Sequence, residues 1–123
     1  MHKILLLSGS VLLFFWGIAH LIPINSVVKS FGNISEDNKH ILVMEWIIEG
    51  LTLLFIAVII ATLTLLDYSN MISTTIFVQC IVMLNVLSVV TLFTGFKVKF
   101  LPYKLCPVIF TGSSILILLG LLL

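Results

Sequence analysis

Four long runs of apolar residues, separated by short polar segments, set the pattern of this chain. The runs cover residues 4–22, 41–66, 71–96 and 105–123. As a helix, the 19 residues of the first run would extend about 28 Å, close to the hydrocarbon thickness of about 30 Å of a typical bilayer. The pattern therefore predicts four membrane-spanning helices and no soluble domain.

The polar segment between the first two runs has a helical pattern of its own. Apolar residues recur at helical spacing on one side, opposite Asn25, Lys29 and Ser30; they are Ile24, Val27, Val28 and Phe31. Pro23 suits the first turn of a helix and Gly32 suits its end. We expect a short amphipathic helix that lies in the membrane interface and covers one end of the bundle.

Local signals also place the second long helix. Ser35 is a favourable N-cap, and acidic residues follow it in the first turn, where the helix dipole favours negative charge. We expect this helix from about Glu36 to Leu66, with its first turn above the membrane. Residues 67–70 then form a turn short enough to make the second and third helices antiparallel neighbours. The predicted fold class is all-α, a single-domain integral membrane four-helix bundle with a short interfacial helix between the first and second spans.

Composition agrees with a membrane protein and excludes some partners. Hydrophobic residues make up 61% of the chain and charged residues 9%, and the mean hydropathy is +1.33. A soluble domain of this composition would aggregate, so the lipid bilayer is the first expected partner. The net charge of +1 and the absence of arginine give no footprint for nucleic acid.

The lysines bear on orientation. The loops after the first and third runs hold all of them except Lys3; they are Lys29, Lys39, Lys97, Lys99 and Lys104. By the positive-inside rule these loops face the cytoplasm and both termini face out. The start of the chain, Met-His-Lys followed by leucines, is similar to a secretion signal and favours the opposite orientation.

Two carboxylates in the second run need an explanation. Glu45 and Glu49 are four residues apart and so share one face of a helix. An ionisable group in hydrocarbon costs several kcal/mol unless it is paired, neutralised or hydrated, and usually marks a functional site. The functional interpretation is a proton-exchanging pair or a cation site. The structural one is a protonated pair bonded to Asn85 or Ser88, or paired with Lys104.

Depth estimates place polar side chains of several helices in one half of the bilayer. Counted at 1.5 Å per residue from the loop side, the depths are about 3 Å for His20, about 6 Å for Glu45, about 12 Å for Glu49 and Ser88, and about 16 Å for Asn85. The other half is nearly all Leu, Ile and Val. We therefore predict a polar pocket that opens toward the lysine-rich loops.

Other residues near this level have two interpretations each. Trp16 and Trp46 either wall the pocket, where they would stack on a flat or cationic ligand, or pack in the core. Gly50 would let a neighbouring helix approach closely. Cys80 and Cys106 differ in depth, at about 24 Å and about 7 Å, by more than a disulfide can bridge. We expect both thiols to be inert packing residues.

His20 has several candidate roles. It is a proton shuttle or metal ligand beside Glu45, or a histidine at headgroup level that bonds a loop carbonyl. With His40 it would supply two axial haem ligands, although two histidines are a weak signal for haem. With His40 and Glu45 it would have the right ligand types for zinc but no recognised spacing. No metal or cofactor is assigned. The candidate ligand-binding residues are His20, Trp16, Glu45, Trp46, Glu49, Asn85 and Ser88.

Two segments carry a family resemblance. Residues 17–23, Gly-Ile-Ala-His-Leu-Ile-Pro, close the first run, and residues 44–52, Met-Glu-Trp-Ile-Ile-Glu-Gly-Leu-Thr, open the second. With the four-helix layout, they resemble small bacterial membrane proteins grouped with the DoxX-like families over nearly the whole chain. That resemblance implies a bacterial inner (plasma) membrane location and a link to membrane redox chemistry with quinones. It identifies no catalytic residue in this chain.

Three functions follow as hypotheses. The first is binding of a small amphipathic or lipid-soluble ligand, quinone-like by the resemblance, around the carboxylate pair. The second is a proton- or cation-coupled carrier or channel subunit acting as an oligomer; the chain is similar in size to small multidrug resistance transporters, but those carry their essential Glu in the first helix. The third is a structural subunit of a larger membrane complex. The apolar half of the predicted bundle favours the ligand-binding hypothesis over a channel, because conduction needs a polar path across the whole span. Catalysis by the chain itself is the least supported.

Overall fold

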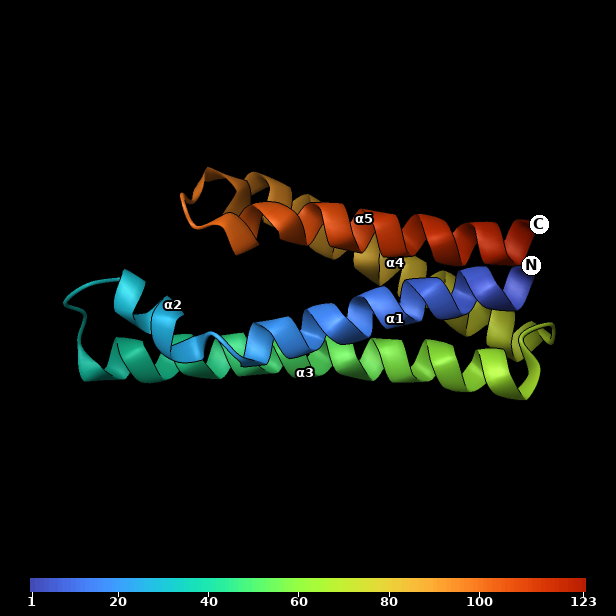
Figure 1. Cartoon of the computed structure of the whole chain (residues 1–123), viewed down its shortest axis with the longest axis horizontal. Coiled ribbons are helices and arrows are strands. Elements are labelled where there is room, and N and C mark those ends of the chain that lie inside the picture. Colours follow the sequence, from blue (N-terminus) through green and yellow to red (C-terminus); the bar gives the residue numbers. More distant parts are fainter.

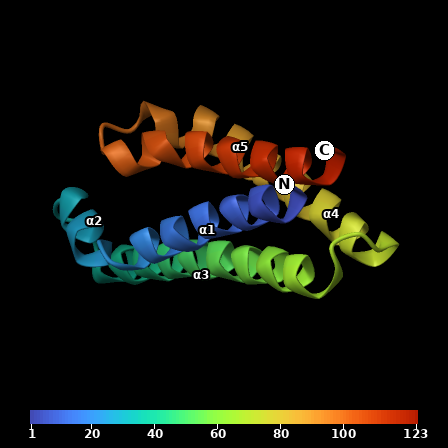
Figure 2. The ribbon, with the colours of Figure 1, turned by 45° about the vertical axis from the view of Figure 1, so that its right-hand side comes forward.

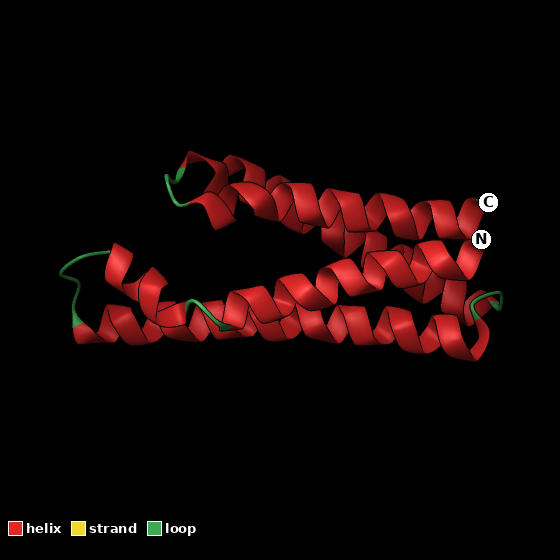
Figure 3. Cartoon of the chain, viewed as in Figure 1, coloured by secondary structure: helices red, strands yellow, loops and turns green.

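The computed structural model describes all 123 residues, and every regular element in it is helical. In chain order the elements are α1 (His2–Leu21), α2 (Ile24–Ser30), α3 (Glu36–Asp67), α4 (Met71–Phe93), the 3₁₀ turn η1 (Gly95–Lys97) and α5 (Leu101–Leu122). Figure 3 shows helices joined by short loops, without strands. The predicted all-α class, with four long helices and a short one between the first two, is confirmed.

The long helices pack one against the next in the order α3, α1, α5, α4. α1 lies against both α3 and α5, and α4 lies against α5 (Figure 1, Figure 2). Both termini lie at one end, beside the turn that joins α3 to α4, which we call the turn end (Figure 1). The opposite end, with α2, η1 and the first turns of α3 and α5, is the loop end.

The prediction that the second and third long helices pack side by side is wrong. α3 and α4 are joined by the short turn at residues 67–70, but they make few contacts along their length. Each packs instead against another helix, α3 against α1 and α4 against α5. A short turn fixes where two helices meet and does not fix which faces they bury.

Capping residues explain most of the observed boundaries. The Ser35 hydroxyl accepts the Asn38 backbone N–H at 3.2 Å, as expected for the start of α3. Asn70 caps α4 by accepting the Ser73 N–H at 2.8 Å. Gly32 follows α2 with φ of +70°, a left-handed conformation that favours glycine.

Two predicted boundaries at the loop end are wrong. The third long helix ends at Phe93 rather than residue 96, and residues 95–97 form η1. The fourth begins at Leu101 rather than residue 105, because Pro102 stands in its first turn, where a missing N–H costs nothing. Residues expected in a lysine-rich loop thus form the first turn of α5.

Close contact between α1 and α3 depends on two glycines. A Cβ on Gly50 would lie 3.1 Å from the Gly17 carbonyl oxygen, and a Cβ on Gly17 would lie 3.0 Å from the Gly50 carbonyl oxygen. The two backbones therefore touch without a side chain between them. The expectation that Gly50 allows a close approach is confirmed, and this contact holds the end of α1 beside the candidate site on α3.

Most of the surface of the long helices is apolar. Between 22 and 39% of the residues in the most apolar stretch of each long helix are buried, so most side chains there face outward. By length and composition, all four helices are able to cross a membrane.

The half of the bundle toward the turn end has few buried polar groups. The core there includes the fully buried Leu6, Ile60 and Phe77. Two of its buried hydroxyls bond to backbone carbonyls, Ser10 to Ala57 at 2.7 Å and Thr64 to Ile60 at 2.6 Å, and the buried Ser113 hydroxyl has no hydrogen-bond partner. The charged residues in its helices lie at the surface.

Candidate functional site

Chemically active side chains from three helices meet near the loop end. α1 contributes His20 in its last turn, α3 contributes Trp46 and Glu49, and α5 contributes Tyr103 and Cys106. The Gly17–Gly50 contact sets the height of His20 against α3, and the early start of α5 brings Tyr103 and Cys106 to the same level.

His20 is the centre of this cluster. Its side chain is 2% exposed. Its Nδ1 lies 3.1 Å from the carbonyl oxygen of Trp16, which only accepts hydrogen bonds, so Nδ1 carries a hydrogen. Its Nε2 then faces Glu49 Oε1 at 3.4 Å and Cys106 Sγ at 3.8 Å. In the neutral ring this Nε2 is an unprotonated lone pair pointed at a carboxylate and a thiol.

Aromatic rings hold the imidazole in place. Trp46 stacks on it with ring centroids 5.0 Å apart, and Trp16 meets it edge-on at 5.5 Å. The Trp46 indole N–H also donates to the backbone carbonyl of His20. Tyr103 closes the group by packing edge-on against Trp46 at 5.3 Å. The His20 ring therefore has one position, with Nε2 toward Glu49.

A cavity opens beside this cluster. It has a volume of about 410 Å³ and lies between α3 and single residues of α4 and α5. Its polar wall includes Glu45, Glu49 and Thr52, with the rings of Trp46 and Tyr103 beside them. The rest of the wall is aliphatic: Leu42, Ile48, Leu53 and Leu87. An amphipathic molecule matches this division into an acidic end and an apolar remainder.

A second cavity of about 460 Å³ lies on the other side of Glu49. Glu49, Tyr103 and Cys106 line it, together with Thr91 of α4 and Phe31, the residue that follows α2. Glu49 and Tyr103 thus stand between the two cavities. The short helix α2 leads into the wall of the second one, consistent with its predicted place over one end of the bundle.

The structure brings five of the seven predicted site residues together and separates two. His20, Trp16, Trp46, Glu45 and Glu49 lie around the cluster or its first cavity. Asn85 and Ser88 lie instead between α4 and α5, where Asn85 donates to Ser114 Oγ at 2.7 Å and Ser88 donates to the Pro107 carbonyl at 3.1 Å. Their expected bonds to the carboxylates are not formed.

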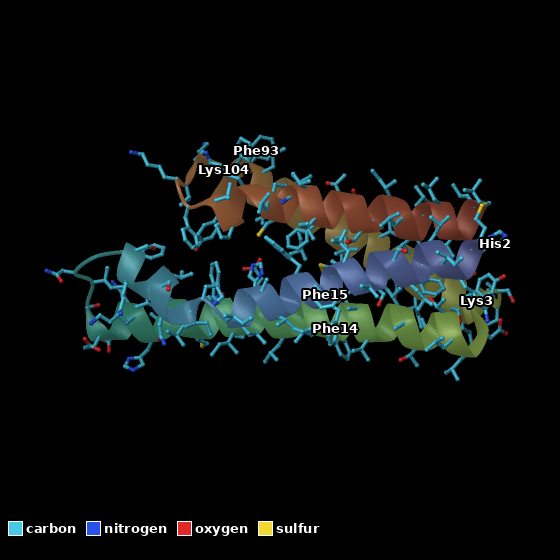
Figure 4. The ribbon with its side chains drawn as sticks, in the orientation of Figure 1. His2, Lys3, Phe14, Phe15, Phe93 and Lys104 are labelled. Atoms are coloured by element: carbon cyan, nitrogen blue, oxygen red, sulfur yellow. The ribbon has the colours of Figure 1, made fainter.

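Two further alternatives do not match the geometry: Lys104 as a partner of the carboxylates, and His40 as a partner of His20. Lys104, a candidate partner of the carboxylates, places its ammonium over the Phe96 ring, 5.8 Å from the centroid; Figure 4 places it at the loop end, far from His2 and Lys3. His40 lies in a surface hollow with Lys29 and Lys39 rather than beside His20. The haem and zinc arrangements that used both histidines therefore have no support in the geometry.

Cys106 and Tyr103 belong to the site although neither was predicted to. Cys106, expected to be inert, lies 3.8 Å from His20 Nε2. The depth count also failed: His20 and Glu49, estimated at about 3 Å and about 12 Å, are level with each other. The count took every helix to begin at the same membrane surface, whereas the first turns of α3 stand beyond the end of α1. Both cysteines are free.

No protein-family model, no curated protein and no solved structure matches the chain. The resemblance to DoxX-like families stays a prediction, and the link to quinone chemistry that it implies stays one with it.

Proposed function

We propose that this chain is an integral membrane protein that binds a small amphipathic molecule with a hydrogen-bond-donating, positively charged head. The head group would sit between Glu45 and Glu49, and the apolar tail would lie along the aliphatic wall of the first cavity. The protein would be a binding or accessory protein of a bacterial plasma membrane rather than an enzyme by itself.

Membrane insertion is supported by the apolar side chains on the outer surface of the bundle. Large apolar side chains are exposed along the middle of the long helices, among them Phe15 at 65%, Phe55 at 66% and Val82 at 57%. Contiguous exposed apolar surface of this extent is unstable in water and is the normal surface of a helix in lipid. Polar loops and turns lie at the two ends of the bundle, as the interfaces of a bilayer require.

The observation that carries the binding proposal is the composition of the first cavity. Two carboxylates line it, and no lysine or arginine does. Aromatic faces stand beside the carboxylates, and such faces attract cations. A charged amine would satisfy both carboxylates and stack against Trp46 or Tyr103 at the same time.

The lining of the first cavity favours an amine over a quinone as the head group of the ligand. Quinone carbonyls only accept hydrogen bonds, and an ionised carboxylate also only accepts them. The lining offers a quinone one free donor group, the Tyr103 hydroxyl, because the Thr52 hydroxyl donates to the Ile48 carbonyl at 2.7 Å. The carboxylate pair would repel a quinone oxygen and attract an ammonium.

His20 gives Glu49 a second role in this proposal. His20 Nε2 faces the same carboxylate from behind, at 3.4 Å. When the ring is protonated, its Nε2–H would compete with a ligand amine for this one carboxylate, and a proton would be able to pass between amine and imidazole through Glu49. Glu45, which is exposed and has no such partner, would supply the plain electrostatic attraction.

The carrier hypothesis finds less support within one chain. The core toward the turn end contains fully buried Leu6, Ile60 and Phe77, and the few hydroxyls there are enclosed among apolar side chains. A conduction path needs polar groups across the whole span. A carrier or complex built from several copies would have to place its path between chains, outside the first cavity.

The test uses Trp46 as a reporter in the full-length protein in detergent. The variant Trp16→Phe leaves Trp46 as the single tryptophan, and a bromine-labelled long-chain primary alkylamine serves as the quenching probe. We expect saturable quenching by the amine and about tenfold weaker binding of an alcohol and of a quinone with the same tail. Equal or tighter binding of the quinone would contradict the proposed head-group chemistry.

Trp46→Phe, which leaves Trp16 as the single tryptophan, is the matched control for detergent partitioning. Trp16 does not line the first cavity, so its quenching should follow the bulk partitioning of the probe without saturation. Equal saturable quenching of both tryptophans would show that the probe does not select this cavity.

A further inference from the structure

We propose that His20, Glu49 and Cys106 form a binding site for a transition-metal ion of the Zn²⁺ class. His20 Nε2, a Glu49 carboxylate oxygen and Cys106 Sγ all lie within 4.8 Å of one another. This site goes beyond the proposed amphipathic ligand and does not depend on it, since Cys106 and His20 do not line the first cavity.

The observed separations fit a shared ion. Zinc bonds of about 2.0 to 2.1 Å to nitrogen or oxygen and about 2.3 Å to sulfur, arranged tetrahedrally, put the donors about 3.3 to 3.6 Å apart. Nε2 of His20 lies 3.4 Å from Glu49 Oε1 and 3.8 Å from Cys106 Sγ. The third pair, the Glu49 carboxylate oxygen and Cys106 Sγ, lies within 4.8 Å, so side-chain rotations of about an ångström would complete the set without moving a helix.

The imidazole is prepared for metal binding by its other nitrogen. Nδ1–H of His20 donates to the Trp16 carbonyl at 3.1 Å, which fixes the tautomer and directs the Nε2 lone pair at the other two ligands. A second hydrogen bond of this type is the usual support of a metal-binding histidine. The stacked Trp46 ring then prevents the imidazole from turning away.

The charges of the three ligands balance a dication. Neutral imidazole, carboxylate and thiolate carry two negative charges together, so the complex with Zn²⁺ has no net charge. That balance lowers the cost of placing the ion in a part of the protein where His20 and Cys106 are each 2% exposed. On binding, the Cys106 thiol gives up its proton, which leaves through the adjoining cavity to solvent, and the sulfur electron pair becomes the metal bond.

The site has a path for entry and an open coordination position. Glu49 and Cys106 both line the second cavity, of about 460 Å³. The chain supplies three ligands, so a water or an exchangeable molecule would complete a tetrahedral ion from that cavity. Mixed nitrogen, sulfur and oxygen donors favour Zn²⁺, or Co²⁺ as its substitute, over Mg²⁺ or Ca²⁺, which prefer oxygen alone.

The test measures metal directly on the full-length protein in detergent. After removal of metal with chelator and addition of Zn²⁺, we expect one zinc per chain by mass spectrometric metal analysis. Co²⁺ should bind with an intense thiolate-to-metal absorption band, which reports the Cys106 ligand without any mutation. Zinc at much less than one per chain, or bound Co²⁺ without the thiolate band, would overturn the proposal.

The chain offers a matched control for each variant. Cys106→Ser and His20→Gln should each weaken Zn²⁺ at least about tenfold, while Cys80→Ser and His40→Gln should leave it unchanged. Elution volume and helical circular dichroism establish that each variant is folded. If a folded Cys106→Ser keeps the affinity of the wild type, the three side chains are a hydrogen-bonded cluster and the metal site does not exist.

Discussion

His20 Nε2 and Glu49 Oε1 lie 3.4 Å apart and join the end of α1 to α3 at the loop end of the bundle. The His20 side chain is 2% exposed and the Glu49 side chain is 36% exposed, so the contact connects a buried ring to an accessible carboxylate. The imidazole is therefore able to respond to whatever occupies the cavities beside Glu49. Glu49 takes part in both proposals, and the metal site also requires His20.

The first prediction concerns the contribution of His20 to the stability of the fold. Its ring is stacked on Trp46 and bonded to the Trp16 carbonyl, so His20→Ala leaves a cavity and removes the imidazole facing Glu49. We expect a loss of about 2 to 4 kcal/mol in the free energy of unfolding. Denaturant unfolding in micelles, followed by circular dichroism, would measure this loss.

His40→Ala is the control for this measurement. His40 is exposed and lies in a surface hollow, so its replacement should change stability by less than about 0.5 kcal/mol. Equal effects of the two substitutions would mean that the cluster around His20 is not formed.

A second prediction follows from the close contact of α1 and α3. In Gly50→Ala the new methyl group would meet Leu21 Cδ2 at 2.7 Å and the Gly17 carbonyl oxygen at 3.1 Å, which forces the backbones apart. We expect a loss of about 1 to 3 kcal/mol, measured by thermal unfolding in micelles. Such a shift would also displace Glu49 from His20.

Gly112→Ala provides the comparison for that helix contact. The only atom within 4 Å of a Cβ there is Leu12 Cδ2, at 3.9 Å. Since alanine is the better helix former by about 1 kcal/mol, this variant should be as stable as the wild type or more so. A destabilised Gly112→Ala together with a tolerated Gly50→Ala would refute the packing of α1.

The third prediction separates the two proposals. Glu45 lines the first cavity but is not among the clustered metal-ligating groups. Glu45→Gln should therefore weaken the alkylamine about tenfold and leave zinc binding intact, whereas Glu49→Gln should weaken both. Quenching titration and metal analysis on the same preparations would give the result. Loss of zinc in folded Glu45→Gln would show that the ligand set is assigned incorrectly.

A fourth prediction concerns orientation, which the lysines at the loop end favour as cytoplasmic. Single cysteines at Asn33 and Ser69 would mark the loop end and the turn end, because both positions are exposed. On intact cells, a membrane-impermeant maleimide should label Ser69→Cys and not Asn33→Cys. The wild type, with two buried cysteines, gives the background. The reverse labelling would invert the orientation.

Signals carried by neighbouring residues predict the four long helices and the short one, but not the end of α4 or the start of α5. Ser35 and Asn38 form the start of α3 within one turn, and Gly32 ends α2 through its own φ angle. Glu45 and Glu49 share a face because the helix period requires it. These features need no knowledge of which helices pack together.

Relationships between distant segments could not be predicted in the same way. The level of His20 against Glu49 depends on how far α3 extends beyond the end of α1, and the position of Cys106 depends on α5 packing against α1. Asn85 and Ser88 have the residue types expected of a site, yet they bond within the α4–α5 interface. The polar residue types indicate which side chains are candidates for the site, and the packing of the helices determines which of them come together.

The most direct test of the account is the location of a bound alkylamine in an experimental structure. Crystals of the protein with a bromine-labelled primary alkylamine would be measured at the bromine absorption edge. We predict an anomalous peak inside the first cavity, beside the aliphatic wall of Leu53 and Leu87, with the amine nitrogen within hydrogen-bond distance of Glu45 or Glu49. Bromine found only on the outer, lipid-facing surface, with both carboxylates sealed against aliphatic side chains, would show that the first cavity is not an amine-binding site.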